Sequence, residues 1–567
     1  MAVVPCGWVG FSLLVFREGA RGVRRIRAKG VVGIGVAVAL VAGAIGGWAL
    51  FRSAEEADDP IVVGTTSTPT MVDPAGAYDA SAWALMSNLY QSLLTFEHGR
   101  EQPVPDAAES CGFTDHELTV YRCTLRDDLT FSNGRAITPE DVRYSYERIQ
   151  AMAERAEQEA ADDSIPEDEK FTYAGPSALL ANLLAVRVDG RDVIFELEHS
   201  DATFPFVVAG SVGAIVDREK YEKLELRDDW QVDGSGPYLL ERWNEGESAE
   251  LVPNPEYRGA NEAPEFPVTV RYFYGGEDES AEEQLAAAWE NGELDVNDGK
   301  MPPQVMSAVN HSDPDNPVTE NTAGSIRVMA FNTDEGMPMA SQVARQTVAA
   351  LLDRETLSSQ VQQGTVEPLY SLIPVGYTGH GTPFFDQYRE RDPEVLRQRM
   401  VDAGLEVPLP FGIAYSRGAA NHEEAATIER QLEADGLFEV EVAHYEWDEF
   451  IPGVYSARDY DAYLIGWRPD FPDPATFTDG ILGPGDGMGT GFSDERIDEL
   501  IAQAQAEPNR ALAADTFLAI HELAAEDAPI VPIWQEKRFT ISREEITGVQ
   551  HLVSGSGVWR LWELRRI

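Results

Sequence analysis

The chain has 567 residues, 43% of them apolar and 9% aromatic, so it can bury a large core and is expected to divide into two or three domains. Lysine and arginine number 44 against 97 aspartates and glutamates, which gives a formal net charge of -53. So large a negative charge repels phosphate backbones, and we therefore expect no nucleic-acid partner.

The first sixty residues are expected to lie outside the fold. Residues 1–30 form a leader whose basic end should stay in the cytoplasm, and residues 31–51 form an uncharged apolar segment. This segment is long enough to cross a bilayer. We therefore expect an uncleaved membrane anchor, with the rest of the chain on the extracytoplasmic face. A cleaved signal peptide is the alternative that stays open.

Three cysteines are present, and Cys6 lies in the leader. Cys111 and Cys123 stand on either side of a turn-like Thr-Asp-His-Glu segment within strand-rich sequence. The pair is predicted to face across a hairpin at bridging distance, and an extracytoplasmic compartment permits a disulfide. Two reduced thiols holding a metal are the alternative, but the additional ligands that zinc needs at short spacing are missing. We therefore expect a disulfide and no metal site.

From Pro60 onward, the sequence pattern alternates between helix and strand. Apolar residues recur at the helical period in some segments and at every second position in others, and Thr138 is placed to cap a helix. We expect a strand at 61–64, a helix at 80–95, a strand at 117–125 and a helix at 139–156. The chain is therefore predicted to be of mixed α/β class.

Several short blocks occur in an order that is typical of one protein family. They lie at 88–94, 125–134, 138–149, 234–238, 254–257, 292–296, 331–333 and 349–355. From about residue 60 to the C-terminus, their order and spacing resemble the family 5 solute-binding proteins of bacterial importers. Such proteins serve the uptake of oligopeptides, dipeptides, nickel complexes and some sugars.

The resemblance implies a two-lobed α/β fold of the type II periplasmic-binding-protein kind, in its three-domain variant. The first lobe would combine residues 60–96, 229–318 and 528–567, with residues 97–228 inserted as an accessory domain. Residues 319–527 would form the second lobe. Two crossing strands would form a hinge, and a solute bound in the interlobe cleft would stabilise the closed state because it touches both lobes.

The run at 460–474 leads from an apolar strand into a proline-stiffened turn. In family members that bind peptides, an aspartate shortly after a Gly-Trp pair holds the terminal ammonium. The matching residue here is Asp470, and Trp467 would form a wall of the same pocket. A carboxylate in a dry cleft needs a cation to offset its desolvation, which an ammonium supplies. The alternative is that Asp470 only caps the turn, the role expected of Asp473.

Further ligand contacts are predicted at four positions. Arg417 lies near the position where dipeptide binders of the family carry an arginine for the carboxylate, although an exposed loop arginine is the alternative. Thr68 and Met71 lie in the loop after the first strand, where the family touches ligand, and both could equally serve the turn. Tyr445 follows a strand of the second lobe, with core packing as its alternative. Leu464 stands where oligopeptide binders have a basic residue, which argues against tripeptide-type recognition.

An enzyme is the rival class. His-Glu pairs at 422 and 521 begin like zinc-protease motifs, but alanine stands where the second histidine is required. We therefore expect a monomeric, non-catalytic substrate-binding subunit without cofactors. It would capture peptides and deliver them to ABC permease subunits with cytoplasmic ATPases. Two alternatives stay open: a binder of oligosaccharides or nickel chelates, and a membrane-tethered peptide sensor that is not coupled to transport.

Overall fold

The computed structural model describes residues 59–567, apart from 98–101, 163, 167–169, 174, 276–279, 419, 486 and 554–557. The expected leader and the expected membrane anchor at 31–51 lie outside these residues, as does Cys6. Within the described part, no helix is both long enough and apolar enough to span a membrane.

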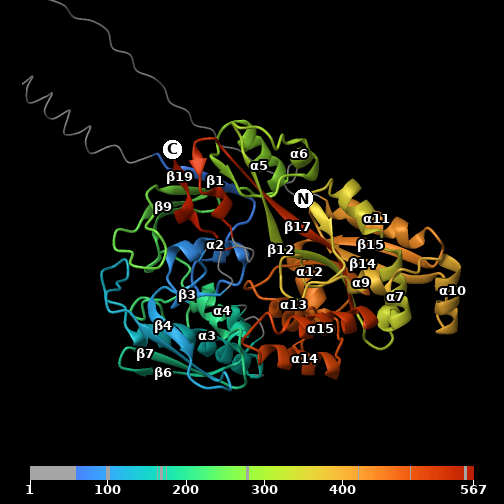
Figure 1. Cartoon of the computed structure of the whole chain (residues 1–567), viewed down its shortest axis with the longest axis horizontal. Coiled ribbons are helices and arrows are strands. Elements are labelled where there is room, and N and C mark those ends of the chain that lie inside the picture. Colours follow the sequence, from blue (N-terminus) through green and yellow to red (C-terminus); the bar gives the residue numbers. More distant parts are fainter. Residues whose placement is uncertain are drawn as a thin grey trace, which may run out of the picture. The chain divides into compact units, whose positions relative to one another are not determined.

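Two long antiparallel strands, β12 (Val318–Phe331) and β17 (Ile530–Ser542), lie in the middle of an 11-stranded mixed sheet (Figure 1). On the β17 side, the first half of the sheet continues through β11 (Val296–Asn297), β1 (Ile61–Thr65), β10 (Val268–Tyr272), β9 (Ser248–Pro253) and β8 (Tyr238–Asn244). On the β12 side, the second half continues through β16 (Ala462–Trp467), β14 (Leu409–Ser416) and β15 (Phe438–Tyr445), while β13 (Val366–Pro368) pairs with β17.

Strand β12 changes its neighbours along its length. Its beginning pairs with β17, where Val318 lies opposite Ile541. From Ile326 onward it pairs with β17 on one edge and with β16 on the other. The register between β12 and β17 shifts between Thr322 and Ile326. Strands β12 and β17 are therefore the connection through which the two halves of the sheet are joined.

Helices pack on both halves of the sheet. Those of the second half are α7 (Gln342–Leu351), α8 (Arg354–Thr356), α9 (Pro383–Gln387), α10 (Pro393–Asp402), α11 (Asn421–Glu433), α12 (Trp447–Pro452), α13 (Ala475–Leu482), α14 (Glu495–Gln505) and α15 (Ala514–Asp527). Those of the first half are α2 (Ala80–Leu89), α5 (Ala281–Glu290) and α6 (Pro303–Ala308). The apolar core of the second half joins β12, β14, β16 and β17 to the helices of that half. A separate core joins β1, β9, β10 and α2 in the first half.

A separate four-stranded antiparallel sheet has the order β4 (Ala108–Phe113), β5 (Val120–Leu125), β7 (Asp192–Leu197), β6 (Leu183–Asp189). It packs with α3 (Pro139–Ala160) and α4 (Phe204–Ala209). Two short ribbons, β2 (Leu94–Thr95) with β3 (Val104–Pro105) and β18 (Ile546–Thr547) with β19 (Arg565–Arg566), complete the strands of the described residues.

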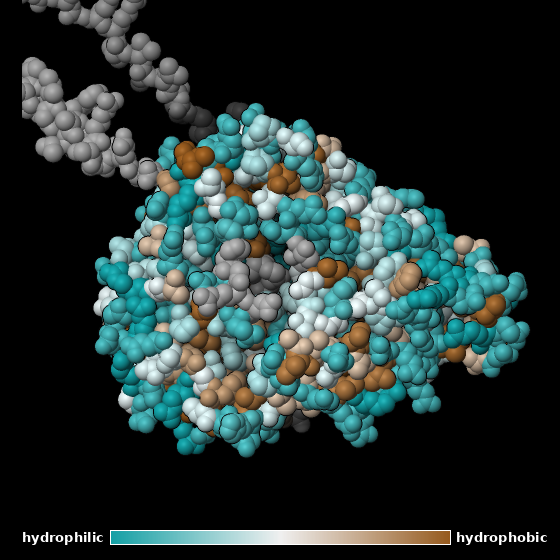
Figure 2. All heavy atoms as spheres, in the orientation of Figure 1, coloured by the Kyte–Doolittle hydropathy of each residue, from teal (hydrophilic) through white to brown (hydrophobic). Residues whose placement is uncertain are grey.

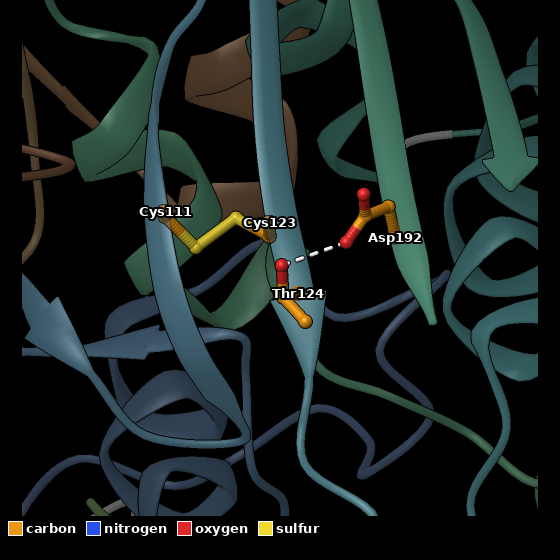
Figure 3. Close-up of a disulfide and its surroundings, with 4 residues drawn as sticks. All are labelled: Cys111, Cys123, Thr124 and Asp192. Atoms are coloured by element: carbon orange, nitrogen blue, oxygen red, sulfur yellow. Dashed lines mark hydrogen bonds between the residues drawn. A yellow bond between two sulfur atoms is a disulfide. The ribbon is translucent and has the colours of Figure 1, made fainter. Parts of the chain in front are cut away.

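The structure contains the predicted disulfide between Cys111 and Cys123. The two residues lie directly opposite each other in the β4–β5 ladder (Figure 3). Beside them, the Thr124 hydroxyl donates a hydrogen bond of 2.7 Å to the carboxylate of Asp192, which links β5 to β7 (Figure 3). One covalent bond and one side-chain hydrogen bond thus tie three neighbouring strands together.

The predicted elements differ from the observed ones at their ends. The helix predicted at 80–95 ends at Leu89, because the backbone turns extended at Tyr90 and the following leucines are buried in a different core. The strand predicted at 117–125 begins at Val120, because the Asp115 carboxylate accepts the backbone N–H groups of Thr119 and Val120 and so holds the preceding residues in a turn. The helix predicted at 139–156 begins in the capping box of Thr138, as expected, and continues to Ala160.

Most of the face seen in Figure 2 is covered by hydrophilic residues, and apolar residues lie there in small separate groups. This distribution agrees with the large excess of acidic over basic residues in the chain. A hydrophilic exterior of one dominant charge keeps a protein soluble and resists association.

A buried ion pair links α3 to the loop that follows β1. Two nitrogens of the Arg148 guanidinium lie 2.5 and 2.7 Å from the two oxygens of Asp73, and both side chains are almost completely buried. Arg148 also donates to the carbonyl oxygens of Glu222 and Glu225, and Asp73 accepts the backbone N–H of Arg227. Such bidentate pairing with further hydrogen bonds is what a buried pair needs to offset its desolvation.

We expect Arg148→Met to lower the free energy of unfolding by about 3–5 kcal/mol, because the Asp73 carboxylate would stay buried without a cation. Urea unfolding followed by circular dichroism measures this loss. Arg187→Met is the matched control, since Arg187 forms an exposed pair with Glu196. Its loss should stay below about 1 kcal/mol. Equal losses in the two variants would contradict the importance of the buried pair.

Candidate functional site

A cavity of about 370 Å³ lies above β17, between the two halves of the large sheet. The end of β1, helix α2, the start of α5 and the loop 298–301 form its wall on the side of the first half. The residues after β14 and β16 form its wall on the side of the second half, and residues 534–539 of β17 form the base. Its volume lies within the range of roughly 300–1,000 Å³ that is usual for small-ligand sites.

Two ion pairs occupy the base of the cavity. Arg538 of β17 lies 2.5 Å from Asp298, whose carboxylate is fully buried and also accepts the Thr540 hydroxyl at 3.1 Å. Glu536 lies 2.7 Å from Lys300. Burial by itself would lower the pKa of Arg538, but attraction to Asp298 outweighs it and raises that pKa. The positive charge of Arg538 is therefore held firmly by its partner.

The same balance acts on Glu536. Burial opposes ionisation of this carboxyl, but attraction to Lys300 and Arg468 outweighs burial and lowers the pKa of Glu536 below its usual value. Both carboxylates at the base of the cavity are thus paired with cations of the protein.

Arg468, the first residue after β16, also lines this cavity. The side chain is half-buried, and it makes no hydrogen bond or ion pair with any residue that the structure describes. Burial lowers the pKa of Arg468, and repulsion from Arg538 adds to this effect. Sequence reasoning missed this residue, because an arginine in a turn looks like a solvent-exposed one until its surroundings are known.

Two aspartates of the turn after β16 have opposite surroundings. Asp473 is buried and forms two contacts of 2.7 Å with Arg510, and it accepts the N–H of Ala475 at the start of α13. Asp470 is half-buried, and no cation among the described residues is in ion-pair contact with it. Asp473 is therefore satisfied within the protein, whereas Asp470 is a carboxylate without a positive partner.

The electrostatic surroundings of Asp470 place it between the two halves. Burial raises the pKa of Asp470 to about 6, and a hydrogen bond with Thr476 opposes part of that rise. Tyr78, just before α2 in the first half, has a raised pKa because of burial and then because of repulsion from Asp470. The carboxylate on the second half is therefore near enough to a tyrosine of the first half to influence it electrostatically.

All six residues predicted to bind the ligand lie in the described part of the chain. Arg417 lines the cavity, whereas Asp470, Trp467, Thr68, Met71 and Tyr445 do not. Arg417 forms an ion pair of 3.0 Å with Glu446, and both side chains are more than half exposed. The indole nitrogen of Trp467 donates to the carbonyl oxygen of Thr476 at 3.0 Å, so this ring packs against α13.

Three of the predicted residues, Thr68, Met71 and Tyr445, do not line the cavity. Thr66 and Ser67 line the cavity, whereas Thr68 does not and Met71 packs against the core of the first half. Tyr445 packs against Tyr460 in a tilted ring pair with 5.0 Å between the ring centroids. Neighbouring residues of an irregular loop point in different directions, which the sequence pattern could not resolve.

We expect Asp298→Asn to lower the free energy of unfolding by about 3 kcal/mol, because Arg538 would lose its counterion next to Lys300. Glu320→Gln serves as the control, since Glu320 is half-exposed and lies 3.4 Å from Lys537. The control should lose less than about 1 kcal/mol. Chemical denaturation of both variants measures the difference, and an unchanged stability of Asp298→Asn would show that this pair does not hold the base of the cavity together.

The comparisons with known proteins agree with this architecture. The probable D,D-dipeptide-binding periplasmic protein DdpA of Escherichia coli K12 is 23% identical over 507 residues, covering 86% of this chain and 91% of that protein. The dipeptide-binding protein DppE of Bacillus subtilis 168 is 21% identical, covering 86% of this chain and 89% of that protein.

Solved structures show the same fold. The ABC transporter-associated periplasmic binding protein DppA of Helicobacter pylori, in complex with the peptide STSA, matches with a TM-score of 0.73 at 17% identity, over 90% of this chain and 98% of that one. The dipeptide-binding protein of Pseudoalteromonas sp. SM9913, in complex with Met-Leu, matches with a TM-score of 0.71 at 19% identity, over 90% of this chain and 100% of that one. The predicted two-lobed α/β fold is thereby confirmed.

The model of the bacterial extracellular solute-binding proteins, family 5, matches residues 102–489, which is more than half of the chain. The match includes β14 and β16, which carry Arg417 and Arg468 at their ends. The chain belongs to family 5 of the bacterial extracellular solute-binding proteins.

Proposed function

We propose that this protein is the extracytoplasmic substrate-binding subunit of an ABC importer and that it captures peptides in the cavity between its two lobes. Membership of the solute-binding family supports this proposal, as do relatives named for dipeptide binding and similar structures with bound peptides. The single observation that carries it within this chain is Asp470, a half-buried carboxylate between the halves that has no cation of its own.

The terminal ammonium of a peptide is the cation that Asp470 would take. A carboxylate that burial has made costly to ionise gains more from a bound cation than an exposed one does. Tyr78 approaches the same carboxylate from the first half of the sheet. A peptide at this place would therefore touch both halves and stabilise their closed arrangement by its differential affinity for that arrangement. Permease subunits would recognise the closed form.

Other parts of the proposal follow from the sequence. We retain the predicted division into lobes. Residues 60–96, 229–318 and 528–567 would form the first lobe, and residues 97–228 would form its inserted accessory domain. Residues 319–527 would form the second lobe. The protein would be a monomer without catalytic activity, anchored by residues 31–51, and its partner subunits would hydrolyse ATP in the cytoplasm. Trp467, Thr68, Met71 and Tyr445 stay predictions of ligand contact, to be reached when the lobes change their relative arrangement.

Asp470→Asn is expected to weaken peptide binding about 100-fold, since a buried charge pair loses its negative partner. Calorimetric titration of the full-length chain with single di- to hexapeptides measures the affinity, and N-acetylation of a peptide should weaken its binding to the wild type to a similar extent. Glu282→Gln is the matched control, because Glu282 lines the cavity and has no ion-pair partner among the described residues. Loss of binding in the control but not in Asp470→Asn would move the ammonium site to Glu282.

The affinity for peptides should also depend on pH through Asp470. The free protein holds the pKa of this carboxyl at about 6, and a bound ammonium would lower it. Affinity is therefore complete above about pH 7 and falls as the pH is lowered through 6, by at most about tenfold per pH unit. Titrations between about pH 5 and pH 7 keep the peptide ammonium protonated. In Asp470→Asn this dependence should be absent, and an identical profile in both proteins would contradict the assignment.

A further inference from the structure

Five cationic side chains line the cavity, and four of them have a carboxylate partner within the protein. The pairs are Arg538 with Asp298, Lys300 with Glu536, Arg417 with Glu446, and Lys537 with Glu320 and Glu367. Arg468 is the fifth, and no carboxylate in the described part of the chain pairs with it. Four of the five cations thus have their charge balanced locally, and Arg468 does not.

The carboxylates near Arg468 are already engaged. Asp298 and Glu536 attract Arg468, but each is in close contact with another cation, at 2.5 and 2.7 Å. Arg538 repels it. Burying a guanidinium without a counterion is unfavourable, and a bidentate carboxylate is the group that matches its planar donors best. Arg468 is therefore a cation without a counterion in contact, and an anionic group from outside would neutralise it. Glu282 also lines the cavity, but no ion pair joins it to Arg468.

The chain places this cation close to the carboxylate of Asp470. Two peptide units separate the residues, so their Cα atoms are at most about 7 Å apart. The residue before a proline favours extended backbone, and Pro469 has a restricted φ, so the turn holds both side chains on a stiff support. Asp470 does not itself line the cavity, so a ligand that uses both charges must reach from the cavity to this turn and carry an ammonium and a carboxylate at a short separation. This requirement is met by a peptide of two or three residues.

We propose that Arg468 binds the carboxylate of the ligand and thereby selects short peptides with a free C-terminus. This inference rests on the proposed capture of peptides at Asp470 and adds to it a residue that determines specificity. Arg417, which was predicted for this role, has a side chain that is more than half exposed. It is already paired with Glu446, so its charge is balanced within the protein. Arg468 lies in the cavity with its charge unbalanced.

The test compares the dipeptide Ala-Leu, its C-terminal amide, and the amide of Ala-Asp by calorimetric titration of the full-length chain. We expect the wild type to bind the free acid at least about 30-fold more tightly than the amide, as for a buried charge pair that loses one partner. Arg468→Gln should bind the acid and the amide with affinities within about threefold of each other. Arg187→Gln, at an exposed arginine that does not line the cavity, is the control and should keep the wild-type preference.

The third ligand separates the two sources of a carboxylate. Recovery of tight binding by the Ala-Asp amide would show that a side-chain carboxylate satisfies Arg468, which overturns the selection of a free C-terminus. A preference for the acid that survives in Arg468→Gln would overturn the role of Arg468. If peptides bind through Asp470 but amidation has no effect, this inference fails and the proposed function stands. If no peptide binds the wild type, both fail.

A stability measurement shows whether the Arg468→Gln variant still folds. Removal of Arg468 relieves its repulsion by Arg538 and loses its attraction to Glu536 and Asp298, but it breaks no close ion pair in the described part of the chain. The thermal midpoint of Arg468→Gln without ligand should therefore stay close to that of the wild type. A marked fall in this midpoint would show that Arg468 holds the fold together, which would overturn its assignment as a residue reserved for the ligand.

Discussion

The antiparallel pairing of β12 with β17 is the constraint on which the rest of the structure depends. It joins the two halves of the large sheet, since β16 continues from β12 and β11 continues from β17. Strand β17 also forms the base of the cavity. Side chains two positions apart in a strand share a face, so Trp534, Glu536 and Arg538 are presented together at that base. The charges of Glu536 and Arg538 in the site are thus a consequence of one strand crossing between the halves.

Ion pairing within the protein then determines which charged side chains remain available to a ligand. The fold supplies a cation for each of the buried carboxylates Asp73, Asp298 and Asp473. It leaves Arg468 and Asp470, two residues of one turn, without ion-pair partners in the described part of the chain. The long-range field of a chain with charge -53 repels anions, so recognition of a carboxylate would depend on close contact within the cavity and not on attraction from a distance.

Local signals in the sequence were sufficient for several elements. Thr138 and Asp141 form the capping box that begins α3, and the Cys111–Cys123 pair lies across a hairpin, because both features depend on residues close in sequence. The end of α2 at Leu89 was not predictable from apolar spacing, since Leu93 and Leu94 are buried by contacts with another core. In the candidate site, Asp470 was identified from its motif, whereas Arg468 beside it was overlooked.

The sequence by itself determined the family, the α/β fold class and the turn that carries the charged residues, because these follow from motif order and from the periods of helix and strand. Only the tertiary structure decided which charges are balanced. Arg510 reaches Asp473 across 37 positions, and Arg538 reaches Asp298 across 240. Such partners are determined by the packing of distant segments. No local pattern shows that Asp473 has a cation partner while Asp470, in the same turn, has none among the described residues.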